Sequence, residues 1–278
     1  MENAFYSATG CARCKITKNY LKENQIPFAE FDFKAEGKEA FAQFYRSNRN
    51  QIFRDKDGVE FPVYDDGKQI KQGVSVILGY LIAGDKLSGF IGRNQLHGEW
   101  IDGFNISAGD PGRVDDLITV LQHLKKSSLK IQATCHGANP AVLEKLLNQG
   151  LVDRLLMEVK GPAALYGQLT GTPLEADALA KSIELAVQFP EFGIFTTIAP
   201  VKRNDGSINF LTAEEVGLTA ELIKTACGNN KIPYLLKSFQ PSAETAEDLK
   251  NLEPLAPAAM FKYRTQARRF LVMSEIEK

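Results

Sequence analysis

Two cysteines, Cys11 and Cys14, lie one helical turn apart in the stretch FYSATGCARCK, residues 5–15. Such a CxxC pair can be a redox dithiol, half of a metal site or part of an ordinary core. The chain has four cysteines in 278 residues, which are too few for a disulfide scaffold. We therefore expect these thiols to be reduced in the cytoplasm, where CxxC indicates redox chemistry or metal binding.

The composition is typical of a globular protein with ample apolar residues for a core. Hydrophobic residues make up 44% and charged residues 24% of the chain, and its length suits two domains. Lys and Arg number 33 against 34 Asp and Glu, so the charge predicts no nucleic-acid partner. No apolar run approaches the roughly 20 residues that span a bilayer, and the start MENAF shows no export signal. We expect a cytoplasmic protein without a membrane partner.

The first 85 positions are expected to alternate between strands and helices, with the CxxC pair at the start of the first helix. Unpaired amides at a helix N-terminus favour a thiolate at Cys11, and the next turn holds Cys14 within disulfide reach. Arg13 and Lys15 add positive charge nearby. The predicted elements are the strands ENAFYSA and PFAEFDF, the helices ARCKITKNYLKEN, FAQFYRS and VSVILGYLIAG, and a hairpin in FPVYDDGKQI.

Two further residues accompany the CxxC pair: Pro62 stands just before a predicted hairpin strand, and Gly73 precedes the last predicted helix. In this combination residues 3–85 resemble the glutaredoxin and thioredoxin superfamily, which has a cis-proline beside its dithiol. The resemblance implies a thioredoxin-like fold in which Cys11 attacks a substrate disulfide and Cys14 then releases the product. It also implies a substrate groove bordered by Pro62, Arg13 and Gly73.

Three departures from glutaredoxins concern the contacts to glutathione. Ala8 stands where a lysine is usual, Ala12 and Arg13 replace Pro-Tyr, and the stretch around Gly73 lacks the Gly-Gly and aspartate pattern. These changes leave dithiol exchange as predicted, and leave open whether glutathione or another thiol reductase supplies the electrons. A metal site and an ordinary core remain as alternatives for the two cysteines.

Residues 86–100 are rich in glycine and lack periodicity, which predicts a linker between a domain at 1–85 and one at 101–278. Beyond them, strands and helices alternate at a spacing that predicts parallel strands joined by right-handed crossovers. Five strands are too few for an eight-stranded barrel, so the expected fold is α/β with a partial barrel. The predicted strands are GFNIS, KIQATC, LVDRLLMEV, GIFTTIAPV and YLLKSF, and the helices lie at 115–126, 141–149, roughly 174–188 and after Thr212.

Five stretches follow one another between about residues 99 and 255: FNISAGDP, ATCHGANPAVLEKLLNQGLVDRLLMEVKGP, YGQLTG, FTTIAP and LLKSFQPS. In this order they resemble radical S-adenosylmethionine proteins, in particular the activating enzymes of anaerobic ribonucleoside-triphosphate reductases. The resemblance implies a degenerate pocket for that cofactor. Its residues would be Ser107, Gly109, Asp110, Pro111, Glu158 and Lys160, with Ala108 in place of a glycine of the family.

One feature of that family is missing from the sequence. Reductive cleavage of S-adenosylmethionine needs a [4Fe-4S] cluster held by three thiolates, which the family supplies as CxxxCxxC. No cysteine occurs between Cys14 and Cys135, and Cys11 and Cys14 have the wrong spacing. We therefore predict no cofactor, no metal site and no radical chemistry.

The two cysteines outside the CxxC pair are interpreted differently from each other. Cys135 and His136 fall at the carboxyl end of a predicted strand, where a third exchanging thiol could relay electrons from Cys14, with His136 assisting thiolate formation. The alternative is a half-buried small residue beside a loop histidine. Cys227 at a helix end is expected to serve packing, and the basic stretch KYRTQARR is expected to be an exposed helix face.

The sequence thus predicts a thiol-disulfide oxidoreductase that delivers electrons to a protein disulfide. A plausible target is an anaerobic, glycyl-radical ribonucleotide reductase, with the cluster-less domain as its docking module and a thiol reductase as electron donor. The alternative is a non-catalytic assembly protein that binds S-adenosylmethionine or a partner and is regulated by its dithiol.

Overall fold

The computed structural model describes residues 3–56, 58–93, 95–242, 245–247 and 249–277. By its internal contacts the chain divides into two compact units, Met1–Gln132 and Ala133–Lys278. Strands and helices occur in both units, so the chain is a mixed α/β protein. No helix in the described ranges is long and apolar enough to cross a membrane.

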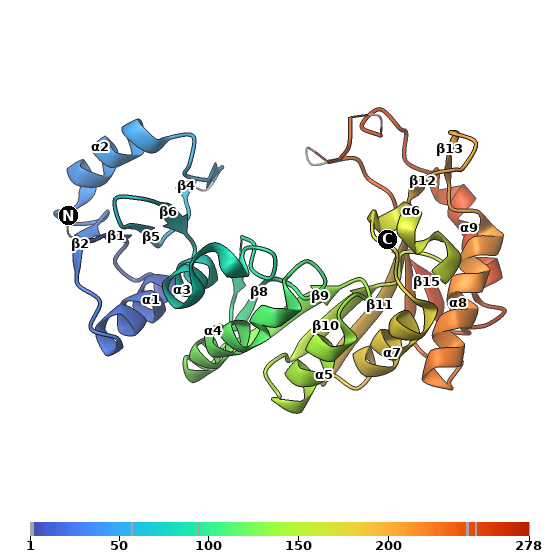
Figure 1. Cartoon of the computed structure of the whole chain (residues 1–278). Coiled ribbons are helices and arrows are strands. Elements are labelled where there is room, and N and C mark those ends of the chain that lie inside the picture. Colours follow the sequence, from blue (N-terminus) through green and yellow to red (C-terminus); the bar gives the residue numbers. More distant parts are fainter. Residues whose placement is uncertain (1–2, 57, 94, 243–244, 248, 278) are drawn as a thin grey trace. The chain divides into compact units, whose positions relative to one another are not determined.

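The first unit begins with a four-stranded sheet in the order β2-β1-β5-β6. The strand β2 is parallel to β1, β5 is antiparallel to β1, and β6 is antiparallel to β5. Figure 1 shows α2 on one side of this sheet and α1 and α3 together on the other. The bounds are β1 Asn3–Ser7, α1 Ala12–Glu23, β2 Phe28–Asp32, α2 Lys38–Asn48, β5 Val63–Asp65, β6 Ile70–Gln72 and α3 Val74–Ala83.

The core of this sheet forms because each helix buries an apolar face against it. Cys14, Thr17 and Leu21 recur at three- and four-residue spacing on α1 and are all buried. Phe5 on β1 and Ile77 on α3 are completely buried as well. The side chain of Cys14 is therefore part of the core, which fixes the start of α1 against the end of β1.

The elements predicted for residues 3–85 are confirmed in order and type, including the hairpin. The hairpin turns at Gly67, whose φ of 79° lies in the region that favours glycine. A second small hairpin, β3 (Arg54–Asp55) with β4 (Gly58–Val59), was not predicted, because strands of two residues show no periodicity.

The segment predicted as a linker, 86–100, is packed rather than open; Asn94 within it lies outside the described residues. A short 3₁₀ helix, Gly84–Leu87, follows α3, and β7 (Leu96–His97) pairs with the start of β8 (Trp100–Asn105). Phe90 is completely buried, and Leu87 and Ile91 pack against α3 at Gly79. These buried apolar side chains show no regular period in the sequence, and the division of the chain at 86–100 stays a prediction.

The chain's largest sheet has seven strands in the order β15-β14-β11-β10-β9-β8-β7. The pairs β10 with β11, β11 with β14, and β14 with β15 are parallel, and β7 with β8 is antiparallel. The five predicted strands are confirmed, and the sheet adds β7 and β15. The remaining strands are β9 Lys130–Cys135, β10 Arg154–Glu158, β11 Glu191–Ile198, β14 Tyr234–Ser238 and β15 Ser274–Ile276.

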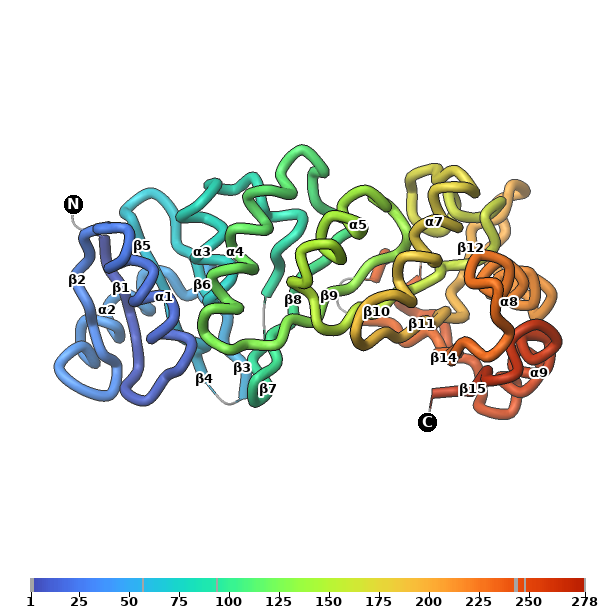
Figure 2. The backbone as a smooth tube through the Cα atoms, turned by 90° about the horizontal axis from the view of Figure 1, so that it is seen from below, coloured from blue at the N-terminus to red at the C-terminus, as the bar shows by residue number. Residues whose placement is uncertain are grey.

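In the second unit, α5, α7, α8 and α9 lie side by side along the strands (Figures 1 and 2). The predicted capping box of α8 is present, because Thr212 and Glu215 each bond to the other's backbone N–H. The helix bounds, with α4 of the first unit and the short elements, are α4 Val114–Lys126, α5 Pro140–Asn148, α6 Tyr166–Thr170, α7 Ala176–Ala186, β12 Pro200–Lys202, β13 Ile208–Phe210, α8 Ala213–Cys227 and α9 Pro257–Ala267.

Candidate functional site

Cys11 and Cys14 form a disulfide, with their Cα atoms 5.3 Å apart. Cys11 is the N-cap residue of α1, and its Sγ accepts a hydrogen bond from the backbone N–H of Cys14 at 3.1 Å. Cys11 is half-buried, whereas only 3% of Cys14 is exposed. In a thiol exchange the outer sulfur meets the substrate and the inner one resolves, so this exposure suits Cys11 as the nucleophile.

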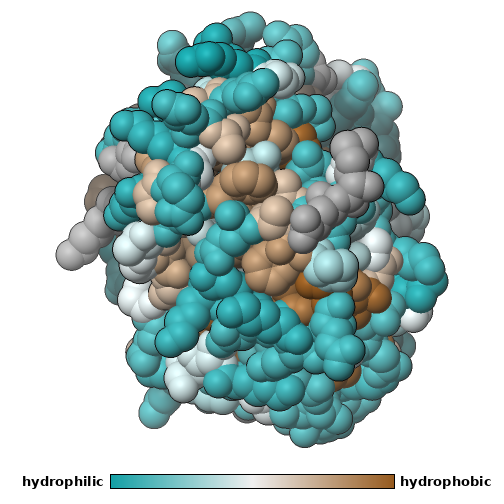
Figure 3. Space-filling model, turned by 90° about the vertical axis from the view of Figure 1, so that its left-hand side faces the viewer, coloured by the Kyte–Doolittle hydropathy of each residue, from teal (hydrophilic) through white to brown (hydrophobic). Residues whose placement is uncertain are grey.

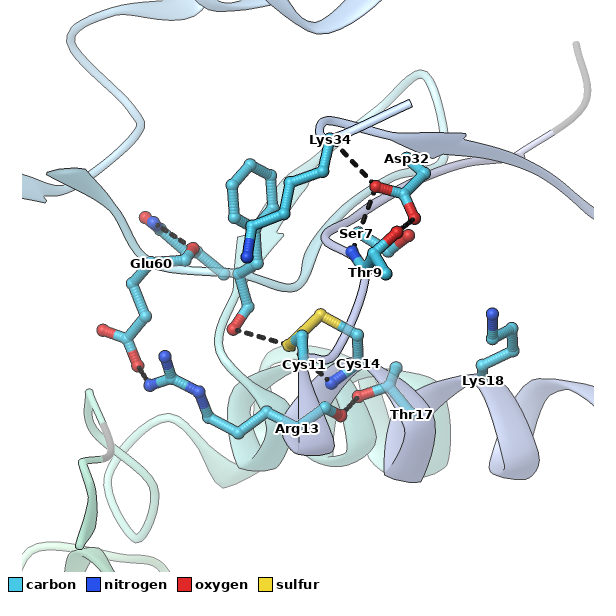
Figure 4. Close-up of a disulfide and its surroundings, with 12 residues drawn as sticks. Ser7, Thr9, Cys11, Arg13, Cys14, Thr17, Lys18, Asp32, Lys34 and Glu60 are labelled. Carbon is cyan, nitrogen blue, oxygen red and sulfur yellow. Dashed lines mark hydrogen bonds and ion pairs between the residues drawn. A yellow bond between two sulfur atoms is a disulfide. The ribbon is translucent and has the colours of Figure 1, made fainter. Parts of the chain in front are cut away.

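The loop before Cys11 is held by Asp32, at the end of β2 (Figure 4). The Asp32 carboxylate accepts hydrogen bonds from the Thr9 N–H at 3.1 Å, the Thr9 hydroxyl at 2.5 Å and the Lys34 N–H at 2.8 Å. The bond from the Thr9 hydroxyl is the main reason that the pKa of Asp32 is lowered. Asp32 was not predicted from the sequence. It could have been found because β1 and β2 are parallel: they end at the same edge of the sheet, so the residues that follow β1 lie beside Asp32 at the end of β2.

Pro62 and Gly73 lie together next to the disulfide. The Phe61–Pro62 peptide bond is cis, and the Gly73 N–H donates a hydrogen bond to the Pro62 carbonyl at 2.9 Å. The Phe61 carbonyl oxygen lies 3.9 Å from Cys11 Sγ. The backbone of Phe61 therefore borders the reactive sulfur, and a substrate groove at Pro62 and Gly73 stays a prediction.

Arg13 is paired with a carboxylate that the sequence analysis did not single out. Its Nη1 lies 2.5 Å from Oε1 of Glu60, which follows β4, and 27% and 13% of the two side chains are exposed. Burial raises the pKa of Glu60, against the opposing effect of Arg13 and Arg93. The positive charge expected beside the dithiol is thus balanced at Arg13.

Three hollows border this part of the first unit. One of about 320 Å³ includes Cys11 and Cys14, with Lys18 and Asp32 in its wall. A second, of about 330 Å³, is lined by Arg13, Glu60 and other charged residues. The third, of about 470 Å³, is mainly apolar and includes the Phe61 side chain. A substrate at Cys11 can therefore meet polar and apolar surfaces.

The residues predicted for one half of the cofactor pocket have local structural partners. The Asp110 carboxylate accepts a hydrogen bond from the Gly112 N–H at 2.9 Å and caps the short 3₁₀ helix Pro111–Arg113. A Cβ at Gly109 would lie 2.1 Å from the Phe90 ring, so close packing explains this glycine. Ser107 follows β8 in the same loop. A cofactor role for Ser107, Gly109, Asp110 and Pro111 stays a prediction.

In the second unit, Glu158 and Lys160 form an ion pair at the end of β10. The nearby Cys135 is 4% exposed, and burial raises the pKa of its thiol to about 12. Burial and the charge of Lys160 lower the pKa of His136. A relay through Cys135 requires a thiolate, so this burial opposes the relay, which stays a prediction. Burial also raises the pKa of Cys227, to about 11, in keeping with packing at the end of α8.

A three-thiolate iron-sulfur site does not fit the cysteines of this chain. Cys11 and Cys14 are joined to each other, Cys135 is buried at the end of β9 and Cys227 ends α8. Within the described ranges, no three His, Cys, Asp or Glu side chains are grouped so as to hold a metal ion. No reaction step is therefore assigned to such a cluster.

No protein-family model matches the chain, and no curated protein matches its sequence. Among solved structures, it is similar to a domain of a pyruvate-formate lyase-activating enzyme from Bacteroides vulgatus. The identity is 13%, the TM-score is 0.43, and the match covers 63% of this chain and 98% of the other.

Proposed function

We propose that this chain is a thiol-disulfide oxidoreductase whose redox pair is Cys11 and Cys14. The observation that carries the proposal is the position of the half-buried Cys11 Sγ at the N-terminus of α1, joined to the buried Cys14. Amides at a helix start favour a thiolate, and a partner thiol one turn away allows the disulfide to close.

The reaction begins from the reduced pair. The Cys11 thiolate attacks one sulfur of a substrate disulfide, which forms a mixed disulfide and releases the first substrate thiol. Cys14, deprotonated, then attacks Cys11 Sγ, which releases the second substrate thiol and closes the Cys11–Cys14 disulfide. Two electrons pass from the dithiol to the substrate, and an external thiol reductant restores the pair.

We also propose a thioredoxin-like fold for residues 3–85. Three features support it: the sheet order β2-β1-β5-β6, the CxxC pair at the start of the helix after β1, and the cis-proline Pro62 near the disulfide. The CxxC pair and the cis-proline segment come from separate points of the chain and lie together, since the Phe61 carbonyl oxygen is 3.9 Å from Cys11 Sγ.

The proposed substrate is a protein disulfide in the cytoplasm, and our candidate is an anaerobic ribonucleotide reductase. Its support is the set of motifs between FNISAGDP and LLKSFQPS, which resemble the activating enzymes of such reductases. In this proposal the part of the chain after residue 100 is a degenerate relative of those enzymes and docks the target.

The test is disulfide-reductase turnover by the wild type, Cys11→Ser and Cys14→Ser, with glutathione or thioredoxin reductase as the electron source. We expect no turnover by Cys11→Ser, and a trapped mixed disulfide with the substrate in Cys14→Ser. The donor that supports wild-type turnover identifies the reductant. Turnover that survives in Cys11→Ser, or its absence in the wild type with both donors, would refute the proposal.

A further inference from the structure

An apolar hollow of about 470 Å³ lies next to the disulfide in the first unit. Its wall includes the rings of Phe33, Phe41, Tyr45 and Phe61. Figure 3 views the molecule from the side of this unit and shows hydrophobic residues reaching the surface in patches enclosed by hydrophilic ones. Phe33 is a large hydrophobic residue that is 37% exposed. We call this hollow the aromatic pocket.

The aromatic rings of the pocket form a connected, preformed surface. The ring centroids of Phe33 and Phe61 lie 5.5 Å apart, and those of Phe41 and Phe61 lie 4.9 Å apart. Phe41 and Phe61 are 4% and 8% exposed, so their rings are fixed by the core. Phe33 is far more exposed than Phe41 and Phe61, at 37%, so it offers a face against which another apolar side chain can pack.

The pocket and the redox pair share one residue, Phe61. Phe61 lines the pocket, and its carbonyl oxygen lies 3.9 Å from Cys11 Sγ. Ala8, three residues before Cys11, also lines the pocket. An extended chain advances about 3.3–3.6 Å per residue, so a substrate whose cysteine reaches Cys11 would place a residue next to that cysteine at the pocket.

The charged residues among the described lining of the pocket are both cationic. Lys34 and Arg54 are exposed and line it, and its described lining residues include no carboxylate. Neither side chain has an ion-pair partner among the residues that the structure describes. In Figure 4 the Lys34 side chain extends toward the disulfide. The nearby Asp32 carboxylate accepts three hydrogen bonds from Thr9 and from the Lys34 backbone.

We propose that the aromatic pocket binds a segment of the protein substrate that carries an aromatic or large aliphatic residue and an acidic residue beside the reactive cysteine. The apolar side chain packs on Phe33, and the carboxylate pairs with Lys34 or Arg54. This inference rests on the proposed function, because it assigns the substrate of the same dithiol. Glutathione offers carboxylates but no apolar side chain, so it leaves the aromatic wall unused.

The test uses peptides of about ten residues whose single cysteine is joined by a disulfide to 2-nitro-5-thiobenzoate. The thiolate of Cys11 attacks the peptide sulfur and releases the coloured thiobenzoate, and Cys14 then releases the peptide as a thiol. One peptide has Phe and Glu on either side of the cysteine, and the others replace Phe by Ala, Glu by Gln, or both. The glutathione disulfide of the same reagent is a further substrate.

We expect kcat/KM for the Phe and Glu peptide to exceed that for the Ala and Gln peptide about tenfold, mainly through KM. Phe33→Ala should remove the preference for Phe and keep the preference for Glu, and the double variant Lys34→Gln with Arg54→Gln should do the reverse. The matched control is Lys22→Gln, an exposed lysine near the end of α1, which should keep both preferences. Ratios between two peptides within one variant cancel any general effect of the substitution on the dithiol.

The outcomes separate this inference from the proposed function. Equal kcat/KM for all peptides, with release that depends on Cys11, would overturn the pocket assignment and leave the oxidoreductase standing. A glutathione disulfide that reacts faster than every peptide would also overturn it. No Cys11-dependent release from any substrate would overturn the proposed function, and the pocket assignment with it.

Discussion

The Arg13 guanidinium lies 2.5 Å from the Glu60 carboxylate, so the charge inside the CxxC motif is compensated across 47 positions of sequence. A nearby positive charge favours a thiolate, and a nearby carboxylate opposes it. Glu60 therefore moderates the effect of Arg13 on the reduced dithiol.

Glu60→Gln should increase the alkylation rate of Cys11 in the reduced protein about two- to fivefold at neutral pH, because Arg13 then acts uncompensated. Burial raises the pKa of Glu60 above its ordinary 4.5. As the pH falls through that raised pKa the wild-type carboxylate becomes neutral, like the Gln side chain, so the difference between the two proteins should shrink. Rates of iodoacetamide labelling at several pH values measure it. The double variant with Arg13→Gln should lose the increase; a rate increase that persists there would contradict this explanation.

Asp32→Asn should destabilise the loop before Cys11. The Asp32 carboxylate accepts two hydrogen bonds from Thr9, one on each oxygen, whereas the Asn side chain is uncharged and has one acceptor oxygen. Hydrogen bonds lower the pKa of Asp32, so its contribution to folding is present above the unfolded-state pKa and is lost as the pH falls through the folded one. The urea midpoint of the wild type should therefore drop more between pH 7 and pH 3 than that of the variant. Equal drops would show that the carboxylate does not stabilise the fold. Asp116→Asn is a control at another partly exposed aspartate of the same unit.

Cys135 should remain unlabelled in the native reduced protein at pH 8, because burial raises the pKa of its thiol to about 12. Cys11 should be alkylated first under the same conditions. Mass spectrometry of protein labelled before and after denaturation measures both sites. Cys135→Ala should keep disulfide-reductase turnover; if turnover falls while the variant stays folded, the relay from Cys14 is real and the burial argument is wrong.

Gly109→Ala should lower the free energy of unfolding by about 1–3 kcal/mol, since the added methyl group meets the Phe90 ring. Reducing the ring with Phe90→Leu in the same chain should recover part of that loss. Urea unfolding of the wild type, Gly109→Ala and the double variant tests this. A variant at Gly109 that is fully stable would instead point to a ligand as the reason for the glycine.

Anaerobic reconstitution with iron and sulfide should leave the protein without a [4Fe-4S] cluster, because Cys11 and Cys14 supply only two thiolates and burial raises the pKa of the other two thiols, Cys135 and Cys227. Iron analysis and dithionite-driven cleavage of S-adenosylmethionine are the measurements. About four irons per chain together with cleavage would contradict this prediction.

The sequence by itself determined the features that depend on neighbouring residues. Cys11 and Cys14 must lie one turn apart on any helix that begins at this motif, and the alternation of apolar runs after residue 100 predicts parallel strands with helices between them. The capping box at Thr212 and Glu215 is similarly local, because both partners lie within one helical turn. These predictions needed no knowledge of the rest of the chain.

Only the tertiary structure decided which distant residues surround the dithiol. The Thr9–Asp32 and Arg13–Glu60 contacts join positions 23 and 47 residues apart, and the Phe61 carbonyl reaches Cys11 across 50. The packed segment around Phe90 escaped prediction in the same way, because burial there depends on α3 and not on a local period. Strand pairing decides which residues that are distant in sequence come into contact. Periodicity along the chain indicates which face of a helix or strand is buried, but not which other element covers that face.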